Sequence, residues 1–155
     1  MPSDDFEELW VRHYAAVART AFLVSGDREA AMDDAQEAFA RAFQHWGKVS
    51  KLERPEGWVH KVATNLAVSR ARRRRPPRMT VRTEPGPEPP DDELFAAIGS
   101  LTPAQRAVIA LRFYLDWSVA DVALALGKQP GTVTALTHQA MVRLREQLSK
   151  ERHDG

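Results

Sequence analysis

A proline-rich segment divides this chain of 155 residues into two parts. Residues 78–92 read RMTVRTEPGPEPPDD, which holds four prolines, one glycine and several charged residues but few apolar side chains. A stretch of this composition cannot bury enough apolar surface to fold, so it favours a semi-extended linker. The sequence therefore predicts two small domains, over residues 1–76 and 93–150, which are joined by a linker at residues 77–92.

Apolar residues recur at spacings of three and four before this linker, which is typical of amphipathic helices. Gly26 should end the first helix, and Asp27 stands where a cap of the second is expected. The second helix should run to about Trp46, and residues 47–56 are predicted as a loop with a turn at residues 55–57. The buried stripe of the second helix is expected to comprise Ala31, Ala35, Ala38, Phe39, Ala42, Phe43 and Trp46.

A third helix is predicted over Gly57–Arg75, and it carries no acidic residue. Residues 57–83 hold eight Lys and Arg and no Asp or Glu, whereas the net charge of the whole chain is only +1. This segregation of charge fits a surface for a polyanion, although a solvated helix end is the alternative. The side expected in the core comprises Trp58, Val59, Val62, Ala63 and Leu66. The side expected in solvent comprises His60, Lys61, Thr64, Asn65, Ser69 and Arg70.

Four shorter helices are predicted after the linker, and the last two have the pattern of a helix-turn-helix. Ala123 leaves room for one helix to cross the other, Gly127 permits the positive φ of a tight turn, and Val133 should fill the angle between them. Asp121 is expected to touch the start of the last helix. The predicted fold class is all-α, with a three-helix bundle before the linker and a four-helix domain after it.

The sequence lacks the motifs that most enzymes and metal sites require. It contains no cysteine, its five histidines have no HxxxH or HxH spacing, and it has no glycine-rich phosphate loop. We therefore expect no enzyme, no cofactor and no bound metal. The acidic N-terminus lacks the apolar core of a signal peptide, and no apolar run approaches the roughly 20 residues of a membrane span. A cytoplasmic protein without a membrane span is expected.

Four motifs in order resemble those of the extracytoplasmic-function (group IV) sigma factors of bacterial RNA polymerase. DDAQEAFARAFQHW at residues 33–46 resembles their polymerase-docking helix, and WVHKVATNLAVSRARRRR at residues 58–75 resembles the segment that opens and reads the minus-ten promoter element. LTPAQRAVIALRFYLDWSVADVALALG, followed by PGTVTALTHQAMVRLREQL, is similar to their helix-turn-helix, whose second helix reads the minus-thirty-five element. The resemblance implies a sigma factor that directs core polymerase to promoters.

The resemblance also implies three groups of contact residues. The clamp helices of the largest subunit of core RNA polymerase would bind Asp33, Gln36, Glu37, Ala40, Arg41 and Gln44. The minus-ten element of promoter DNA would bind Lys61, Thr64, Asn65, Ser69, Arg70, Arg72 and Arg73. The minus-thirty-five element would bind Gly131, Thr132, Thr134, Ala135, His138, Gln139 and Arg143. Members of this family are usually held inactive by an anti-sigma factor, so such a partner is implied as well.

The recognition helix departs from the family pattern, which usually has Lys, Ser, Arg and Arg at four of its positions. This chain has Thr134, Ala135, Leu136 and Gln139 there. We therefore expect weak binding of the upstream element or an unusual recognition sequence. A stand-alone helix-turn-helix regulator is the alternative function; it would need a dimer interface to read a symmetric site, and no heptad seam is visible. A helical scaffold protein is a further alternative, but it leaves the acid-free stretch unexplained.

Overall fold

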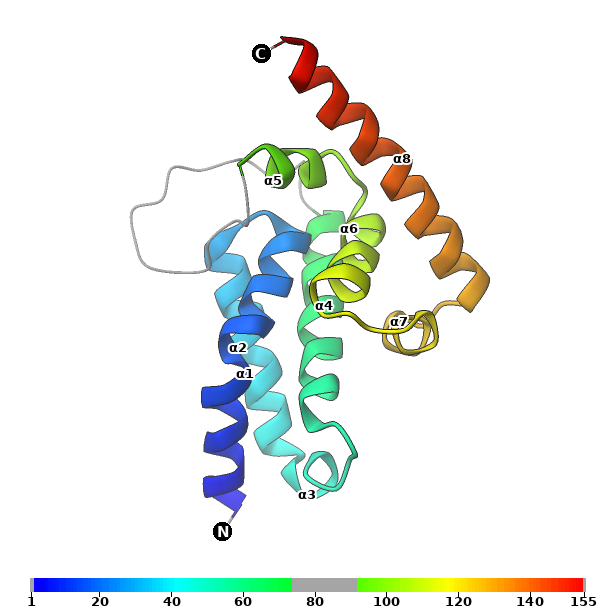
Figure 1. The fold of residues 1–155 in the computed structure, drawn as a ribbon. Coiled ribbons are helices and arrows are strands. Elements are labelled where there is room, and N and C mark those ends of the chain that lie inside the picture. Colours follow the sequence, from blue (N-terminus) through cyan, green and yellow to red (C-terminus); the bar gives the residue numbers. More distant parts are fainter. Residues whose placement is uncertain (1, 74–91, 155) are drawn as a thin grey trace.

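The computed structural model of the chain describes residues 2–73 and 92–154, and every regular element within these ranges is a helix (Figure 1). The predicted all-α fold is confirmed. The predicted linker lies outside the described residues except for its last residue, where a helix begins, and residues 74 and 75 lie outside them too. Within the described ranges, no helix combines the length and the apolar character that crossing a lipid bilayer requires.

Three long helices pack side by side in the first half (Figure 1). They are α1 (Pro2–Ser25), α2 (Arg28–Gln44) and α4 (Pro55–Arg73). The boundary between α1 and α2 is the predicted one. Gly26 adopts a φ of 69°, a left-handed conformation that glycine tolerates. Asp27 then caps α2, because its carboxylate accepts a hydrogen bond of 3.1 Å from the amide of Ala30.

The core of the first half combines small residues on α2 with aromatic residues around them. Phe39 is fully buried, and its ring centroid lies 4.8 Å from that of Trp10. Phe43 was predicted in the same buried stripe, and this prediction is wrong, because the residue is 56% exposed. Successive residues turn by about 100° around a helix, so Phe43 lies about a quarter-turn from the centre of the buried row. It packs edge-on against Phe6 at the border of the core.

Residues 47–56 were predicted as a loop, but half of them belong to helices. A short helix, α3 (Trp46–Val49), follows α2 and buries its first and last residues in the core. Pro55 opens α4 rather than a turn before it. Proline suits the first helical position because its φ is already helical and it has no N–H to leave without an acceptor. The connection between the two helices is therefore only residues 50–54.

The second half consists of short helical elements followed by one long helix. Its elements are α5 (Asp92–Gly99), α6 (Pro103–Ile109), the π-helical turn η1 (Ala110–Tyr114), α7 (Val119–Leu126) and α8 (Pro130–Asp154). Thr102 and Gln105 form a capping box at the start of α6, in which each side chain accepts a hydrogen bond from the other residue's amide. This cap was predicted from Thr102, whereas the wider turn of η1 was not predicted.

The last two helices form the predicted helix-turn-helix. Ser118 caps α7 by accepting a hydrogen bond of 3.1 Å from the amide of Asp121. Gly127 ends α7 with a φ of 64°. Val133 is fully buried in the same apolar cluster as Val122 of α7. This arrangement fixes α8 at a steep angle to α7 and leaves one side of α8 in solvent (Figure 1).

The two halves share an apolar cluster, which the sequence did not predict. Residues of α1, α4, α5, α6 and α8 pack together in it, among them Phe22, Val68, Phe95, Ile98 and Leu144. The rings of Phe22 and Phe95 lie 4.8 Å apart between their centroids. The division into two domains stays a prediction. In the arrangement that the structure describes, the second half rests against α1 and α4.

A buried arginine also joins the halves. Arg106 of α6 is 3% exposed, and its guanidinium donates to the carbonyl oxygens of Val24 and Leu101, each at 2.6 Å. Val24 lies in the last turn of α1, where carbonyl groups have no partner within the helix. Burial lowers the pKa of Arg106. Arg106 therefore donates a hydrogen bond to a carbonyl group at the end of α1, 82 residues earlier in the sequence.

Candidate nucleic-acid interface

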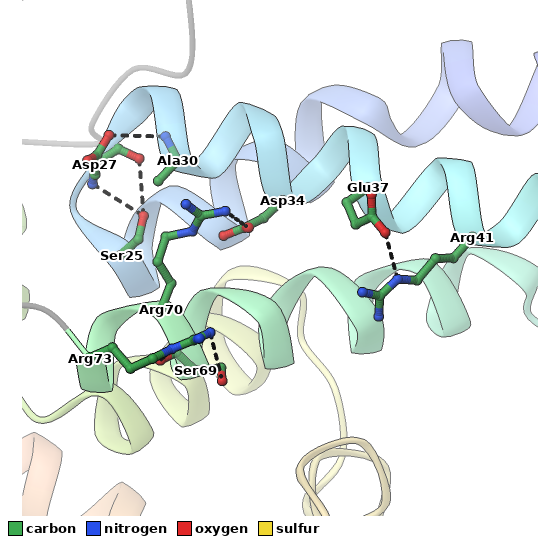
Figure 2. Close-up of polar contacts among 9 residues, drawn as sticks. All are labelled: Ser25, Asp27, Ala30, Asp34, Glu37, Arg41, Ser69, Arg70 and Arg73. Carbon is green, nitrogen blue, oxygen red and sulfur yellow. Dashed lines mark hydrogen bonds and ion pairs between the residues drawn. The ribbon is translucent and has the colours of Figure 1, made fainter.

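All six residues expected to dock on the polymerase are exposed along one side of α2. They are Asp33, Gln36, Glu37, Ala40, Arg41 and Gln44. The opposite side of α2 lies in the core, so the helix has one face available to a partner. Glu37 and Arg41 form an ion pair of 2.9 Å on this strip, and both side chains are about half exposed (Figure 2). Such an exposed pair contributes little to stability.

One residue expected to contact the minus-ten element, Arg70, turns toward the protein instead of toward solvent. Its guanidinium donates to Asp34 at 2.8 Å, and the side chain of Asp34 is 2% exposed (Figure 2). The hydrogen bond to Asp34, together with the negative charge of Asp34, raises the pKa of Arg70. A cleft of about 260 Å³ lies beside the pair and is also lined by Leu66 and Arg73. Arg70 thus joins α4 to α2.

The other expected contacts on α4 have different surroundings. Lys61, Ser69, Arg72 and Arg73 are exposed. Asn65 is exposed as well, but its amide donates to the carbonyl oxygen of Ala125 in α7 at 2.9 Å. Thr64 is fully buried, so its place on a solvent-facing side was wrongly predicted. Arg73 folds back on its own helix, where its guanidinium donates to the backbone and hydroxyl oxygens of Ser69 (Figure 2).

His60 was predicted in solvent, and this prediction is wrong too. It is buried, and its ring meets that of Trp117 edge-on, with 5.9 Å between centroids. Burial, with a smaller effect from the charge of His13 on α1, lowers the pKa of His60 to about 4. Trp117 comes from the connection between η1 and α7. The solvent-facing side of α4 is therefore narrower than its sequence suggests, because the second half covers part of it.

The seven residues expected to read the minus-thirty-five element are all exposed on α8. They are Gly131, Thr132, Thr134, Ala135, His138, Gln139 and Arg143. No Lys, Arg, Asp or Glu occurs between Pro130 and Val142. The hydroxyl of Thr134 donates to the carbonyl oxygen of Pro130 within the helix. The exposed side of α8 is therefore nearly uncharged over its first three turns.

Asp121 does not have the contact that was expected. Its carboxylate lies 3.9 Å from the guanidinium of Arg54 in the first half, and both side chains are at least 48% exposed. The amide of Asp121 donates to the cap residue Ser118, which places Asp121 in the first turn of α7. From this turn the side chain reaches the first half rather than the start of α8.

Sequence reasoning missed Arg106 and Trp117, which both belong to the contact between the halves. A signal for Arg106 exists in its neighbours, because a lone arginine precedes the apolar run Ala107–Leu111. A charged side chain that is buried normally has its hydrogen bonds satisfied, as those of Arg106 are. No comparable signal marks Trp117. Within residues 2–73 and 92–154, no group of three or more His, Asp or Glu side chains could hold a metal ion.

Comparison with known proteins identifies both halves of the chain. Residues 9–76 match the family described as Sigma-70 region 2, and residues 91–144 match Sigma-70, region 4. The RNA polymerase sigma-E factor of Streptomyces coelicolor is 31% identical over 154 residues, which cover 93% of this chain and 86% of the relative. The ECF RNA polymerase sigma factor SigE of Mycolicibacterium smegmatis is 32% identical over 97% of this chain. The match spans 63% of the length of that relative.

A solved structure has the same fold. The sigma factor RpoE from Bartonella quintana, crystallised in complex with the anti-sigma factor NepR, matches with a TM-score of 0.71. The match covers 94% of this chain and 97% of that one at 20% sequence identity. At this identity the likeness concerns the fold alone, and it extends over both halves.

Proposed function

The chain belongs to the extracytoplasmic-function (ECF) family of RNA polymerase sigma factors, and from this premise we propose that it directs core RNA polymerase to promoters in three separate contacts. The exposed strip of α2 binds the clamp helices of the largest polymerase subunit. The polar side of α4 binds the minus-ten element, and the exposed side of α8 binds the minus-thirty-five element. A sigma factor positions the polymerase on DNA and is not itself an enzyme.

The observation that carries this proposal is the exposure of all six docking residues on α2, opposite a side that is closely packed in the core. A helix that is packed in the core on one side and exposes polar residues on the other offers a rigid surface to a partner helix. On α4, Lys61 and the arginines at positions 72 and 73 supply positive charge that follows a phosphate backbone. Among the expected minus-ten contacts, we now assign Arg70 mainly to the packing of α4 on α2.

In vitro transcription with core polymerase across a genomic DNA library tests the function. We expect initiation at a small set of start sites whose upstream sequences share two elements. Absence of promoter-selective initiation would overturn the proposal. Stable binding of the chain to core polymerase in the absence of DNA separates a sigma factor from a stand-alone regulator, which has no need of that contact.

Two substitutions separate the polymerase contact from the DNA contact. Gln36→Ala should weaken binding to core polymerase and leave the opening of bound promoters unchanged. Lys61→Ala should do the reverse, and Lys61 is a cleaner choice than Asn65, which also contacts α7. Arg19→Ala removes an exposed cation from α1 and serves as the matched control. Loss of polymerase binding alone in both variants would contradict the DNA role of α4.

We also propose that an anti-sigma factor holds the chain inactive in the cell. The support is membership of the family, together with the solved relative, which was crystallised with such a partner. Affinity purification of the tagged chain under uninduced conditions should recover this partner. The recovered protein should abolish transcription in the reconstituted assay, and a protein that binds without inhibiting would contradict this part of the proposal.

A further inference from the structure

A row of exposed residues runs along the side of α8 that faces solvent. Its members follow one another at intervals of four residues, so each lies next to the following one on the helix surface. They are Gly131, Ala135, Gln139 and Arg143. The first two have almost no side chain, and a carbon added at Gly131 would meet open space. Another surface can therefore approach the first turns of α8 closely, and Gln139 is the first long side chain that it meets in this row.

The side chains on this part of α8 match A·T base pairs. In the major groove, arginine and lysine pair with guanine, and aspartate and glutamate pair with cytosine. None of these four residue types occurs between Pro130 and Val142. Glutamine pairs with adenine through two hydrogen bonds, and the methyl groups of alanine and threonine pack on that of thymine. Ala135 and Thr134 expose such methyl groups, and the hydroxyl hydrogen of Thr134 is already donated to its own helix.

Gln139, which stands where the family usually has arginine, is held by a residue of α6. This helix packs against α8 (Figure 1). The amide oxygen of Gln139 accepts a hydrogen bond of 3.5 Å from the amide nitrogen of Gln105. The amide oxygen of Gln105 accepts in turn from the backbone amide of Thr102 at 3.1 Å, within the capping box of α6. The cap therefore fixes the direction of the Gln105 side chain, and Gln105 orients Gln139.

This contact leaves Gln139 able to pair with adenine. A carbonyl oxygen has two lone pairs, so the oxygen that accepts from Gln105 can also accept from adenine N6. An N–H group of the same amide can donate to adenine N7. A bond of 3.5 Å is long, so it contributes little to stability. Its effect is to order the Gln139 amide in advance, which lowers the entropy lost when that amide binds a base.

We propose that Gln105 and Gln139 form an adenine-reading pair and that α8 reads its upstream element as A·T base pairs. The proposal rests on the proposed function, since it specifies the sequence that α8 reads. Gln139 contacts the adenine, and the methyl groups of Ala135 and Thr134 pack on thymines. Gln105 is a positioning residue, because it acts through Gln139 and does not itself touch the base. On such an element, Gln139→Arg would lose the base contact and place its cation on a phosphate, which raises affinity for all sequences alike.

Selection of promoters by the complex of core polymerase and the chain tests the base preference. The probe is a promoter found in the transcription assay, with its upstream element randomised, and the bound templates are sequenced. We expect A·T pairs to dominate, with one position at which adenine is bound about tenfold better than guanine. Gln139→Ala should abolish the preference at this position alone, and Gln139→Glu should shift it to cytosine. Gln147→Ala, the same change about two turns further along α8, is the matched control and should keep it.

Gln105→Glu tests the positioning role separately from folding. Glutamate also accepts from the backbone amide of Thr102, so the capping box and the melting temperature should be unchanged. A carboxylate cannot donate to the amide oxygen of Gln139, however. The adenine preference should therefore fall by about threefold, at the same position that Gln139→Ala affects. An unchanged preference would show that Gln105 does not position Gln139.

Modified bases separate direct reading from recognition of DNA shape. A protein can prefer A·T-rich DNA without touching its bases, because such DNA has a narrow minor groove. Replacing the selected adenine by 7-deazaadenine removes the N7 acceptor, so it should weaken binding of the unsubstituted chain and leave that of Gln139→Ala unchanged. An adenine preference that survives in Gln139→Ala, or an element of G·C pairs, overturns the proposal and leaves promoter-selective initiation intact. Absence of such initiation would instead overturn the proposed function.

Discussion

The ion pair between Arg70 and Asp34 yields a prediction that distinguishes a packing role from a DNA-binding role. We consider Arg70→Met, which keeps an unbranched apolar side chain but removes the guanidinium. The matched control is Arg41→Met, because Arg41 forms an ion pair of similar length with Glu37 on the exposed side of α2 (Figure 2). The two pairs differ in burial, since Asp34 is 2% exposed in its side chain and Glu37 is 51% exposed.

The expected magnitude follows from this difference. Removing one partner of a buried ion pair typically destabilises a protein by about 3–5 kcal/mol, because the remaining charge is left in a poorly hydrated site. Arg70 is 34% exposed, and Asp34 has a further interaction within the protein, so we take the lower end of this range. We expect Arg70→Met to lower the free energy of unfolding by about 3 kcal/mol. Arg41→Met should change it by no more than about 0.5 kcal/mol.

Thermal and urea unfolding at pH 7, followed by circular dichroism, measure both variants. For a chain of this length, 1 kcal/mol corresponds to about 2–4 °C in melting temperature, so Arg70→Met should melt about 10 °C below the unsubstituted protein. Melting of both variants within about 2 °C of that protein would refute the reasoning. If Arg70→Met also kept its polymerase affinity and lost promoter opening, Arg70 would be a DNA contact after all.

Three further predictions concern pH, salt and backbone conformation. Burial lowers the pKa of His60 to about 4, whereas the unfolded chain binds this proton near pH 6.5, so stability should fall by about 2–3 kcal/mol between pH 7 and pH 4.5. His60→Phe should flatten the pH dependence of stability measured by urea unfolding. An equally steep dependence in this variant would show that His60 does not cause it. Thr134→Lys with Gln139→Arg should raise promoter affinity and steepen its logarithmic salt dependence by about 2, since each new phosphate contact contributes about 0.9; an unchanged slope contradicts the DNA role of α8. Gly127→Ala should destabilise the protein by about 1 kcal/mol through its φ of 64° alone, because nothing lies within 4 Å of the added carbon, and Gly131→Ala, which adds its carbon to equally open space without a positive φ, is the control.

The features that the sequence predicted correctly depend on neighbours along the chain. Asp27 and Thr102 each cap a helix through an amide three residues later, and Gly127 ends a helix through its own φ. The exposed sides of α2 and α8 also followed from the sequence, because each lies opposite a regular apolar stripe. These features depend only on interactions between residues that are close in sequence, so the sequence is sufficient to predict them.

The features that the sequence did not reveal depend on contacts across the two halves. His60 and Thr64 occupy the side of α4 that was predicted in solvent, yet both are buried, and the ring that packs edge-on against His60 lies 57 positions later in the chain. The buried state of Arg106 requires a carbonyl group 82 residues earlier. Helical periodicity describes one helix at a time, so it carries no information on which polar side meets another element. For this reason, the packing of the second half on α1 and α4 could not be predicted.

The shared apolar cluster has a consequence for the order of synthesis. Ala67 and Val68 leave the ribosome well before Leu144, their partner in this cluster, is made. At about 5–20 residues per second, the first half waits on the order of ten seconds with this surface uncovered. Arg106, which binds the end of α1, is made about halfway through that interval. We therefore expect chaperones to bind the nascent first half. Packing of the second half on this surface should then release them.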